Sequence, residues 1–185
     1  MLGSIISERY AKALFELAIE NKKLEEVKND MALLMEVIRV SREFKQMLVS
    51  PVFRPDKKIG VMDSIFKDRT QVLTKKFYHL IIQKRREKYL PDIARHFIEK
   101  YKEYHHIVTL ELRSVVPIEE DLRNKIIEII KQGRKVRIDL VEIQDESLIG
   151  GFIITSKEQR YDASLKSAIR KLKKEFEENL YIREI

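Results

Sequence analysis

The sequence contains no cysteine, which excludes disulfide bonds and thiolate chemistry and suits a reducing compartment. It has only five glycines, at positions 3, 60, 133, 150 and 151, and they form neither a phosphate-binding loop nor a dinucleotide-binding fingerprint. No apolar run approaches the roughly 18 residues that a membrane-spanning helix needs. The first residues show no cleavage signature, so we expect no signal or transit peptide.

Catalytic constellations are equally scarce, because no serine lies in a nucleophile-elbow context. His96, Glu99 and Glu103 share one helical face, as metal ligands do. A structural metal needs about four convergent ligands, so a polar helix face is the simpler interpretation. Asp145 and Glu146 are adjacent carboxylates, but they precede a glycine pair and no pocket is predicted there. We therefore expect a chain that is not an enzyme by itself and that binds no cofactor.

Positive charge is in excess, with a formal net charge of +7 from 37 Lys and Arg against 30 Asp and Glu. Both signs are interspersed along the chain, as they are on a solvated surface. Basic clusters occur at residues 84–86 and within 171–174, without the interleaved aromatic side chains on which bases stack. A basic two-domain RNA- or DNA-binding protein is therefore kept as the alternative to a protein-binding function.

Apolar residues recur at helical spacing through the first 105 residues. Pro51 ends one helical stretch, and Pro55 suits the first turn of the next. The pattern predicts six short helices with short connections, at about 5–19, 24–41, 44–48, 55–66, 70–86 and 91–101. Such an arrangement is typical of an all-α bundle, so we assign residues 1–105 to one helical domain.

The apolar period changes from 3.6 to 2 residues at His106. The pattern then predicts strands near 108–116, 136–140 and 150–155, a helix before the second strand, and a last helix that Asp162 caps. Residues 106–185 thus form a small β-α-β-β-α domain, and the fold class is α plus α/β in two domains. A pH-sensing role and a plain linker role both stay open for His105 and His106.

Two of the predicted helices carry apolar arcs wider than a surface helix needs. In the first, Ile6, Tyr10, Ala13, Leu14 and Leu17 form one strip, and further apolar residues continue around the helix. In the fifth, the apolar strip that includes Leu80 extends sideways in the same manner. Such a helix either lies in the middle of its own bundle or packs on its own core with one side and on a partner helix with the other. The arc width alone leaves both interpretations open.

Four sequence motifs in order resemble the δ subunit of F-type ATP synthases, the family of the oligomycin-sensitivity-conferring protein. The first is the run from Arg9 to Ala18, RYAKALFELA. The second is Ser50-Pro51-Val52 with Lys58 downstream, and the third is Arg85-Arg86 with Leu90 and Ile93. The most specific is the C-terminal block, which comprises Asp145, Leu148-Ile149-Gly150-Gly151 and Tyr161-Asp162-Ala163-Ser164.

The resemblance implies a non-catalytic clamp in the peripheral stalk, present in one copy and located at the cytoplasmic face of a bacterial inner membrane. Residues 1–105 would bind the N-terminal helix of subunit α in a groove between the first and fifth helices, and residues 106–185 would bind the C-terminal region of subunit b. The predicted groove residues are Ile6, Tyr10, Ala13, Leu14, Leu17, Leu80 and Lys84. The motif residues expected to be structural are Pro51, Asp145, Gly150, Gly151 and Asp162.

Overall fold

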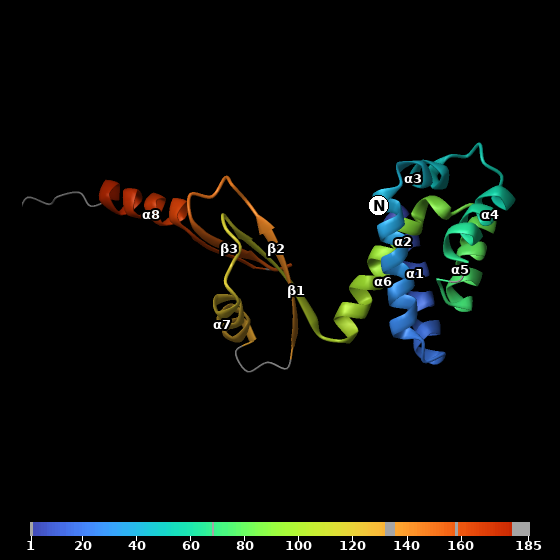
Figure 1. Cartoon of the computed structure of the whole chain (residues 1–185), viewed down its shortest axis with the longest axis horizontal. Helices are drawn as coiled ribbons and strands as arrows, with labels where there is room; N and C mark the ends of the chain where they lie inside the picture. The colour runs from blue at the N-terminus through green and yellow to red at the C-terminus, as the bar shows by residue number, and fades with distance from the viewer. Residues whose placement is uncertain (1, 68, 132–135, 158, 179–185) are drawn as a thin grey trace, which may run out of the picture. The chain divides into compact units, whose positions relative to one another are not determined.

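The computed structural model describes residues 2–67, 69–131, 136–157 and 159–178. The chain divides into two compact units, which we call unit 1 (Met1–Tyr104) and unit 2 (His105–Ile185). Unit 1 is helical, and the described strands all lie in unit 2 (Figure 1). The division therefore lies next to the residue at which the apolar period changes.

Unit 1 is an assembly of helices in which α1 and α2 pack mainly against α6, whereas α5 packs mainly against α4 (Figure 1). Pro55 occupies the start of α4, where its missing N–H costs no hydrogen bond. The elements are α1 (Leu2–Glu20), α2 (Leu24–Val40), α3 (Arg42–Val49), α4 (Pro55–Phe66), α5 (Val72–Gln83), the 3-10 helix η1 (Glu87–Tyr89) and α6 (Leu90–Tyr104).

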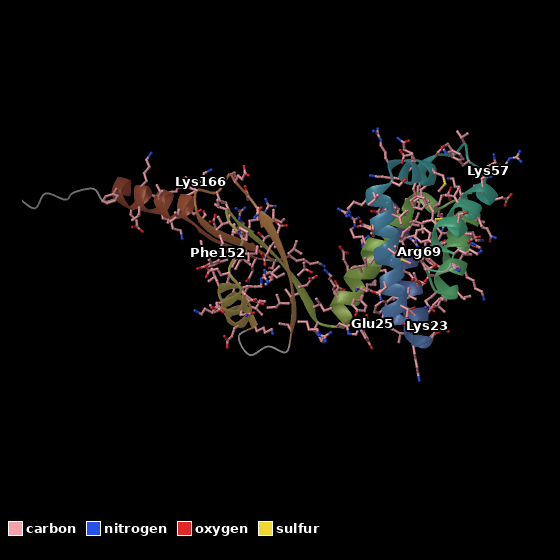
Figure 2. The ribbon with its side chains drawn as sticks, in the orientation of Figure 1. Lys23, Glu25, Lys57, Arg69, Phe152 and Lys166 are labelled. Atoms are coloured by element: carbon pink, nitrogen blue, oxygen red, sulfur yellow. The ribbon has the colours of Figure 1, made fainter. Side chains whose placement is uncertain are left out.

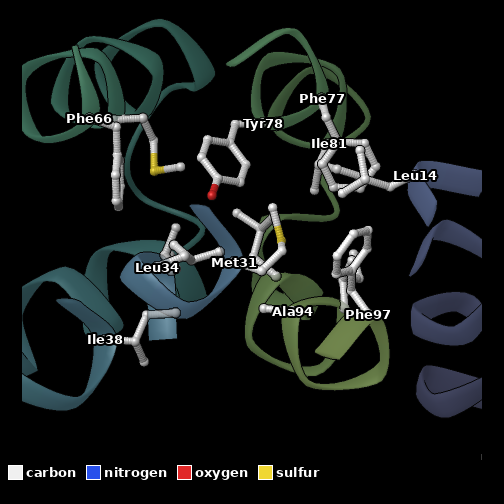
Figure 3. Packing of buried hydrophobic residues seen from close by; sticks show 14 of the residues in the cluster. Leu14, Met31, Leu34, Ile38, Phe66, Phe77, Tyr78, Ile81, Ala94 and Phe97 are labelled. Atoms are coloured by element: carbon white, nitrogen blue, oxygen red, sulfur yellow. The ribbon is translucent and has the colours of Figure 1, made fainter. Parts of the chain in front are cut away.

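One apolar cluster fills the centre of unit 1, and each of its α-helices contributes to it. Figure 3 shows Leu14 of α1 beside Phe77 and Ile81 of α5, with Phe97 of α6 below them. Small residues of α1, such as Ala11 and Ala18, lie in the same cluster. Small side chains let two helix backbones approach closely, which accounts for the extensive packing of α1 on α6.

The fifth helix is shorter than the sequence predicts, because α5 ends at Gln83 rather than near Arg86. Arg85 adopts a left-handed conformation with φ of 54°, and its N–H donates to the carbonyl of Ile82 at 2.9 Å. A left-handed residue directly after a helix ends it, and glycine usually fills that position. Arginine gives no such signal in a sequence, so the helical pattern seemed to continue.

A buried ion pair fixes the chain just after α5. The Nζ of Lys58, in α4, lies 2.6 Å from Oε1 of Glu87 and donates to the carbonyl of Leu48 at 3.2 Å. The Lys58 side chain is almost entirely buried, and Oε2 of Glu87 is buried with no hydrogen-bond partner among the described residues. A charge buried in this way is costly to leave unpaired, so the pair constrains where η1 lies.

Unit 2 contains a mixed sheet with strand order β2-β1-β3-β4, in which β1 and β2 are parallel and the other pairs are antiparallel. Its apolar core includes Leu110, Leu112 and Ile154 from the sheet and Ile126 from α7. The elements are β1 (Ile107–Ser114), α7 (Glu120–Lys131), β2 (Arg137–Gln144), β3 (Gly151–Thr155), β4 (Arg160–Ser164) and α8 (Leu165–Glu178).

The predicted β-α-β-β-α order of this domain is wrong by one strand, because β4 follows β3 and pairs with it. The strand Arg160–Ser164 is short, contains two charged residues and lies at the edge of the sheet. Pairing with β3 forms it, with Gly151 opposite Ser164 and Thr155 opposite Arg160. This pairing is a long-range contact, and a local pattern of apolar residues does not reveal it. The strand therefore gives only a weak signal in the sequence.

The start of α8 also differs from the prediction, because Ser164 caps the helix and Asp162 supports the cap. The N–H of Ser167 donates to Oγ of Ser164 at 3.2 Å. The hydroxyls of Ser164 and Ser167 donate to the Asp162 carboxylate at 2.6 and 2.8 Å, and the N–H of Ser164 donates to it at 3.0 Å. These hydrogen bonds, led by those from Ser164, lower the pKa of Asp162 to about 2.

We predict that Lys58→Met lowers the free energy of unfolding of unit 1 by about 3 kcal/mol, because it leaves the Glu87 carboxylate buried without its partner. Urea denaturation followed by circular dichroism measures the loss. The double variant Lys58→Met with Glu87→Leu should recover most of it, since an apolar pair replaces a buried ion pair at little cost. Equal losses in the single and double variants would contradict this account.

We also predict that the Asp162 carboxyl has a pKa of about 2 in the folded chain, below its ordinary pKa of 3.8. Because folding lowers this pKa, the carboxylate stabilises unit 2 above about pH 4, and that contribution is lost as the pH falls through about 2. Carbon-detected NMR of the carboxyl group gives the midpoint. Ser164→Ala and Ser167→Ala should raise it, whereas Ser156→Ala should not. A wild-type midpoint at 3.8 would refute the network.

Candidate functional site

One strip of α1 faces the core of unit 1. Ser7, Ala11, Leu14 and Ala18 are each 0% exposed. Leu14 was predicted to contact a partner helix. It belongs to this core-facing strip instead, and its side chain is completely buried beside Phe77 and Ile81 (Figure 3). Leu14 therefore supports the candidate site from beneath and is removed from its surface.

A second strip of α1 lies next to the buried one and reaches the surface. Ile6 and Tyr10 are half-buried, Ala13 is exposed, and Leu17 exposes 43% of its surface. Their spacing of four, three and four residues keeps them on one side of the helix. The wide apolar arc of α1 thus resolves into a core-facing strip and a half-open strip.

The fifth helix divides its apolar residues in the same way. Tyr78, Ile81 and Ile82 are buried in the core. Leu73, Phe77, Leu80 and Lys84 follow the same spacing of four, three and four residues along another side, from α5 into the turn that follows it. Phe77 is largely buried on this side, whereas Leu80 exposes 44% of its surface and Lys84 is exposed.

The half-open strips of α1 and α5 lie alongside each other, with the two helices running in opposite directions. The ring of Tyr10 contacts that of Phe77 edge-on, with 6.4 Å between centroids. At the other end, Nζ of Lys23 donates to Oε1 of Gln71 at 2.6 Å, which joins the residues after α1 to those before α5. We call this surface the α1–α5 face, and its residues are Ile6, Tyr10, Ala13, Leu17, Leu73, Phe77, Leu80, Lys84 and Arg86.

Arg86 belongs to this face although it is not among the predicted groove residues. Its Nη1 donates to the hydroxyl of Tyr10 at 2.7 Å, and its guanidinium carbon lies 5.5 Å from the centre of the Tyr10 ring. A guanidinium over an aromatic face is an attractive cation–π contact. The left-handed turn at Arg85 brings Arg86 back towards α1. Its sequence signals were its place in the basic cluster 84–86 and in the Arg85-Arg86 motif.

The N-terminus of α5 is held by a carboxylate from another helix. Asp30 of α2 is buried and accepts hydrogen bonds from the N–H of Gln71 at 2.9 Å and the hydroxyl of Thr74 at 2.5 Å. Burial raises the pKa of Asp30, and these hydrogen bonds partly oppose that rise. A carboxylate at this position satisfies free amide groups of the helix and interacts favourably with its dipole. Asp30 thereby fixes where α5 lies relative to the core.

The α5 side of the face is bordered by positive charge. Lys76 and Lys84 lie four residues before and after Leu80, and Arg85 and Arg86 follow. All four side chains are exposed, and no carboxylate in the described part of the chain forms an ion pair with them. The face therefore combines exposed apolar side chains with an unneutralised basic border.

The motif residues of unit 2 shape the turns around α8. Gly151 has a φ of 78°, and a Cβ added to it would lie 2.3 Å from the carbonyl oxygen of Ala163. A Cβ on Gly150 would lie 2.7 Å from the Leu165 side chain. Asp145 accepts a hydrogen bond from the N–H of Ser147 at 3.0 Å, and the hydrogen bonds from Ser147 lower its pKa. These contacts constrain the backbone at all three residues.

Pro51 is exposed in the turn between α3 and α4. His96 lies beside Glu99 on α6, with 3.2 Å between Nδ1 and Oε2. Within the described residues, no three His, Cys, Asp or Glu side chains gather closely enough to hold a metal ion. None of the described helices combines the length and apolar character needed to cross a membrane.

Comparisons with known proteins agree on one family. A profile described as "ATP synthase delta (OSCP) subunit" matches residues 6–176. The ATP synthase subunit delta of Christiangramia forsetii is 30% identical over 100% of both chains. That of Carboxydothermus hydrogenoformans is 33% identical over 94% of this chain and 98% of its own. A chain in the Toxoplasma gondii mitochondrial ATP synthase hexamer has the same fold, with a TM-score of 0.72, 21% identity and coverage of 94% of this chain and 98% of that one.

These matches run along nearly the whole chain and include both units. They give no support to the RNA- or DNA-binding alternative. The chain belongs to the ATP synthase delta (OSCP) subunit family, and is a non-catalytic subunit of the ATP synthase peripheral stalk.

Proposed function

We propose that the α1–α5 face receives the N-terminal helix of the ATP synthase α subunit, and that unit 1 is a six-helix bundle that presents this face. The observation that carries the proposal is that two half-open apolar strips, from α1 and α5, lie alongside each other with Tyr10 between them. An amphipathic helix binds such a surface through anchors at positions i, i+3, i+4 and i+7.

The distribution of exposure along the face suggests how a partner helix would bind. Leu17 and Leu80 are the most open of its large apolar side chains, so they have much solvent contact to lose when covered. Tyr10 is already oriented by Phe77 and Arg86, so little rotamer freedom remains to be lost when it contacts a partner. Aromatic side chains held in this way often dominate the binding energy of an interface.

We further propose that unit 2 binds the C-terminal region of the b subunit, that one copy of the chain is present per complex, and that it lies at the cytoplasmic face of a bacterial inner membrane. The family resemblance and the delta subunits matched above over both units support this assignment. One unit would then hold the catalytic head and the other the stalk, so the chain would connect the two.

This function is mechanical. The rotor exerts torque on the catalytic head, and the peripheral stalk must keep the head from turning with it. From Ile6 to Leu17 the α1 strip covers roughly 16 Å of helix, at 1.5 Å per residue. Anchors spread over that length share a lateral load, whereas a single anchor would bear all of it.

We predict that Leu80→Asp weakens binding of a synthetic peptide of the α subunit N-terminus by at least about tenfold, because it places a charge in the apolar contact. Isothermal titration calorimetry measures the affinity. Val61→Asp is the matched control, since Val61 is exposed to 39% against 44% for Leu80 but lies on α4, which contributes no residue to the α1–α5 face. Wild-type affinity in Leu80→Asp would refute the assignment.

We also predict that a fragment of residues 1–104 folds alone and binds the α peptide but not the b subunit, because its core cluster contains residues of unit 1 only. Cooperative thermal unfolding checks the fold, and co-sedimentation with the soluble part of b checks the division of roles. If the fragment bound b as well as the full chain does, unit 2 would not be the b-binding unit.

A further inference from the structure

We propose that α8 binds a long acidic helix of the partner of unit 2 through a two-stranded, coiled-coil-like contact. This inference rests on the proposed function, since it assigns the surface and the chemistry with which unit 2 would hold the b subunit. The contact surface is a stripe of four apolar side chains on α8, which we call the α8 stripe: Leu165, Ile169, Leu172 and Phe176.

The α8 stripe is open to solvent along its whole length. Its side chains expose between 52% and 79% of their surface, with Phe176 the most open. They are not part of the apolar core of unit 2, and the main packing partner of α8 is β4. The helix leaves the sheet at the end of β4 (Figure 1). Four large apolar side chains on one side of a helix, all exposed, indicate a surface that a partner covers.

The direction of α8 is fixed at its root. The N–H of Leu165 donates to the carbonyl of Gly150 at 3.0 Å, and Gly150 has no side chain that would displace Leu165. The carboxylate of Asp162 holds the hydroxyls of both Ser164 and Ser167. These contacts attach the first turn of the helix to β3 and β4, so the stripe is presented in a defined orientation relative to the sheet.

The spacing of the α8 stripe identifies the kind of partner. Successive members are four, three and four residues apart, which is the strict heptad seam of a two-stranded coiled coil. A helix that packs on a globular core or lies in a membrane surface carries a broader apolar arc. The stripe is about one side chain wide, so it matches one other helix with the same narrow seam.

Charge on the edges of the stripe defines the chemistry of that helix. Lys166 projects from the first turn of α8 (Figure 2), and it and Lys173 occupy the positions that flank a heptad seam on one edge. Glu175 flanks the other edge, where it would be repelled by an anionic membrane. The partner helix is therefore expected to place a carboxylate opposite Lys166.

The same charges argue against a second copy of this chain as the partner. In an antiparallel pair of α8 helices, the edge with Lys166 and Lys173 would face the same edge of the other copy, so lysines would oppose lysines. In a parallel pair, Lys173 would face Ala168 of the other copy, so this edge would give no electrostatic attraction between the two helices. A different, acidic helix would be attracted to this basic edge in either direction.

The test uses the full chain and the soluble C-terminal part of b from the same ATP synthase, with affinity measured by calorimetry. We expect Ile169→Asp to weaken binding by more than about tenfold, because it breaks the middle of the seam. We expect Lys166→Glu to weaken it several-fold and to remove part of its salt dependence. The matched control is Lys171→Glu, an exposed lysine on α8 that lies away from the seam. Circular dichroism and α-peptide affinity, both unchanged, show that the variants are folded.

The outcomes separate this inference from the function on which it rests. If the wild-type chain does not bind b, the proposed function of unit 2 is wrong and the proposal falls with it. If the wild type binds but Ile169→Asp binds equally well, b is held elsewhere and only the α8 proposal is overturned. A third outcome is that the wild type binds vesicles of phosphatidylglycerol and phosphatidylcholine in equal parts, and that Ile169→Asp loses this binding while it still binds b. That result would make α8 a membrane-surface helix and would also overturn the α8 proposal.

Discussion

The contact of Tyr10 with Phe77 and Arg86 is the interaction on which the α1–α5 face depends. It joins two helices whose main packing partners lie elsewhere, α6 for α1 and α4 for α5. A closely packed pair would bury its apolar strips mutually and leave nothing for another chain. A pair with no contact would have no defined separation. The Tyr10 contacts, together with Leu14 beneath them (Figure 3) and the Lys23–Gln71 hydrogen bond, set the spacing and leave Leu17 and Leu80 open.

In unit 2, the apolar side chains of the α8 stripe are likewise open to solvent. Exposed apolar side chains contribute no burial energy to the isolated chain, so stability has to come from other contacts. In unit 1 that contribution comes from the large core together with the buried groups Asp30 and Lys58. In unit 2 it comes from a small core and from the Asp162 network at the root of α8. Polar contacts thus hold the start of α5, the chain just after its end, and the root of α8.

Periodicity predicted the helical domain and the wide apolar arcs of α1 and α5, but it left open whether a partner covers part of each arc. It could not divide that arc correctly. Leu14 lies at the border of the two strips of α1, and only the position of α6 and α5 decides that it faces inwards. The end of α5 was missed because the left-handed residue is Arg85 and not glycine. Both β4 and the cap at Ser164 depend on pairing with β3, which a local pattern does not contain.

The placement of the buried polar groups also bears on how the subunit resists torque. Apolar contacts set affinity but are non-directional, so they permit sliding. Hydrogen bonds and ion pairs have fixed geometry, and in a low-dielectric interior they are costly to break. Asp30 fixes one end of α5, and the Lys58–Glu87 pair fixes the chain after its other end. Under the proposed binding of a helix to the α1–α5 face, lateral force would pass into contacts that resist displacement, and the apolar strips would determine which helix binds.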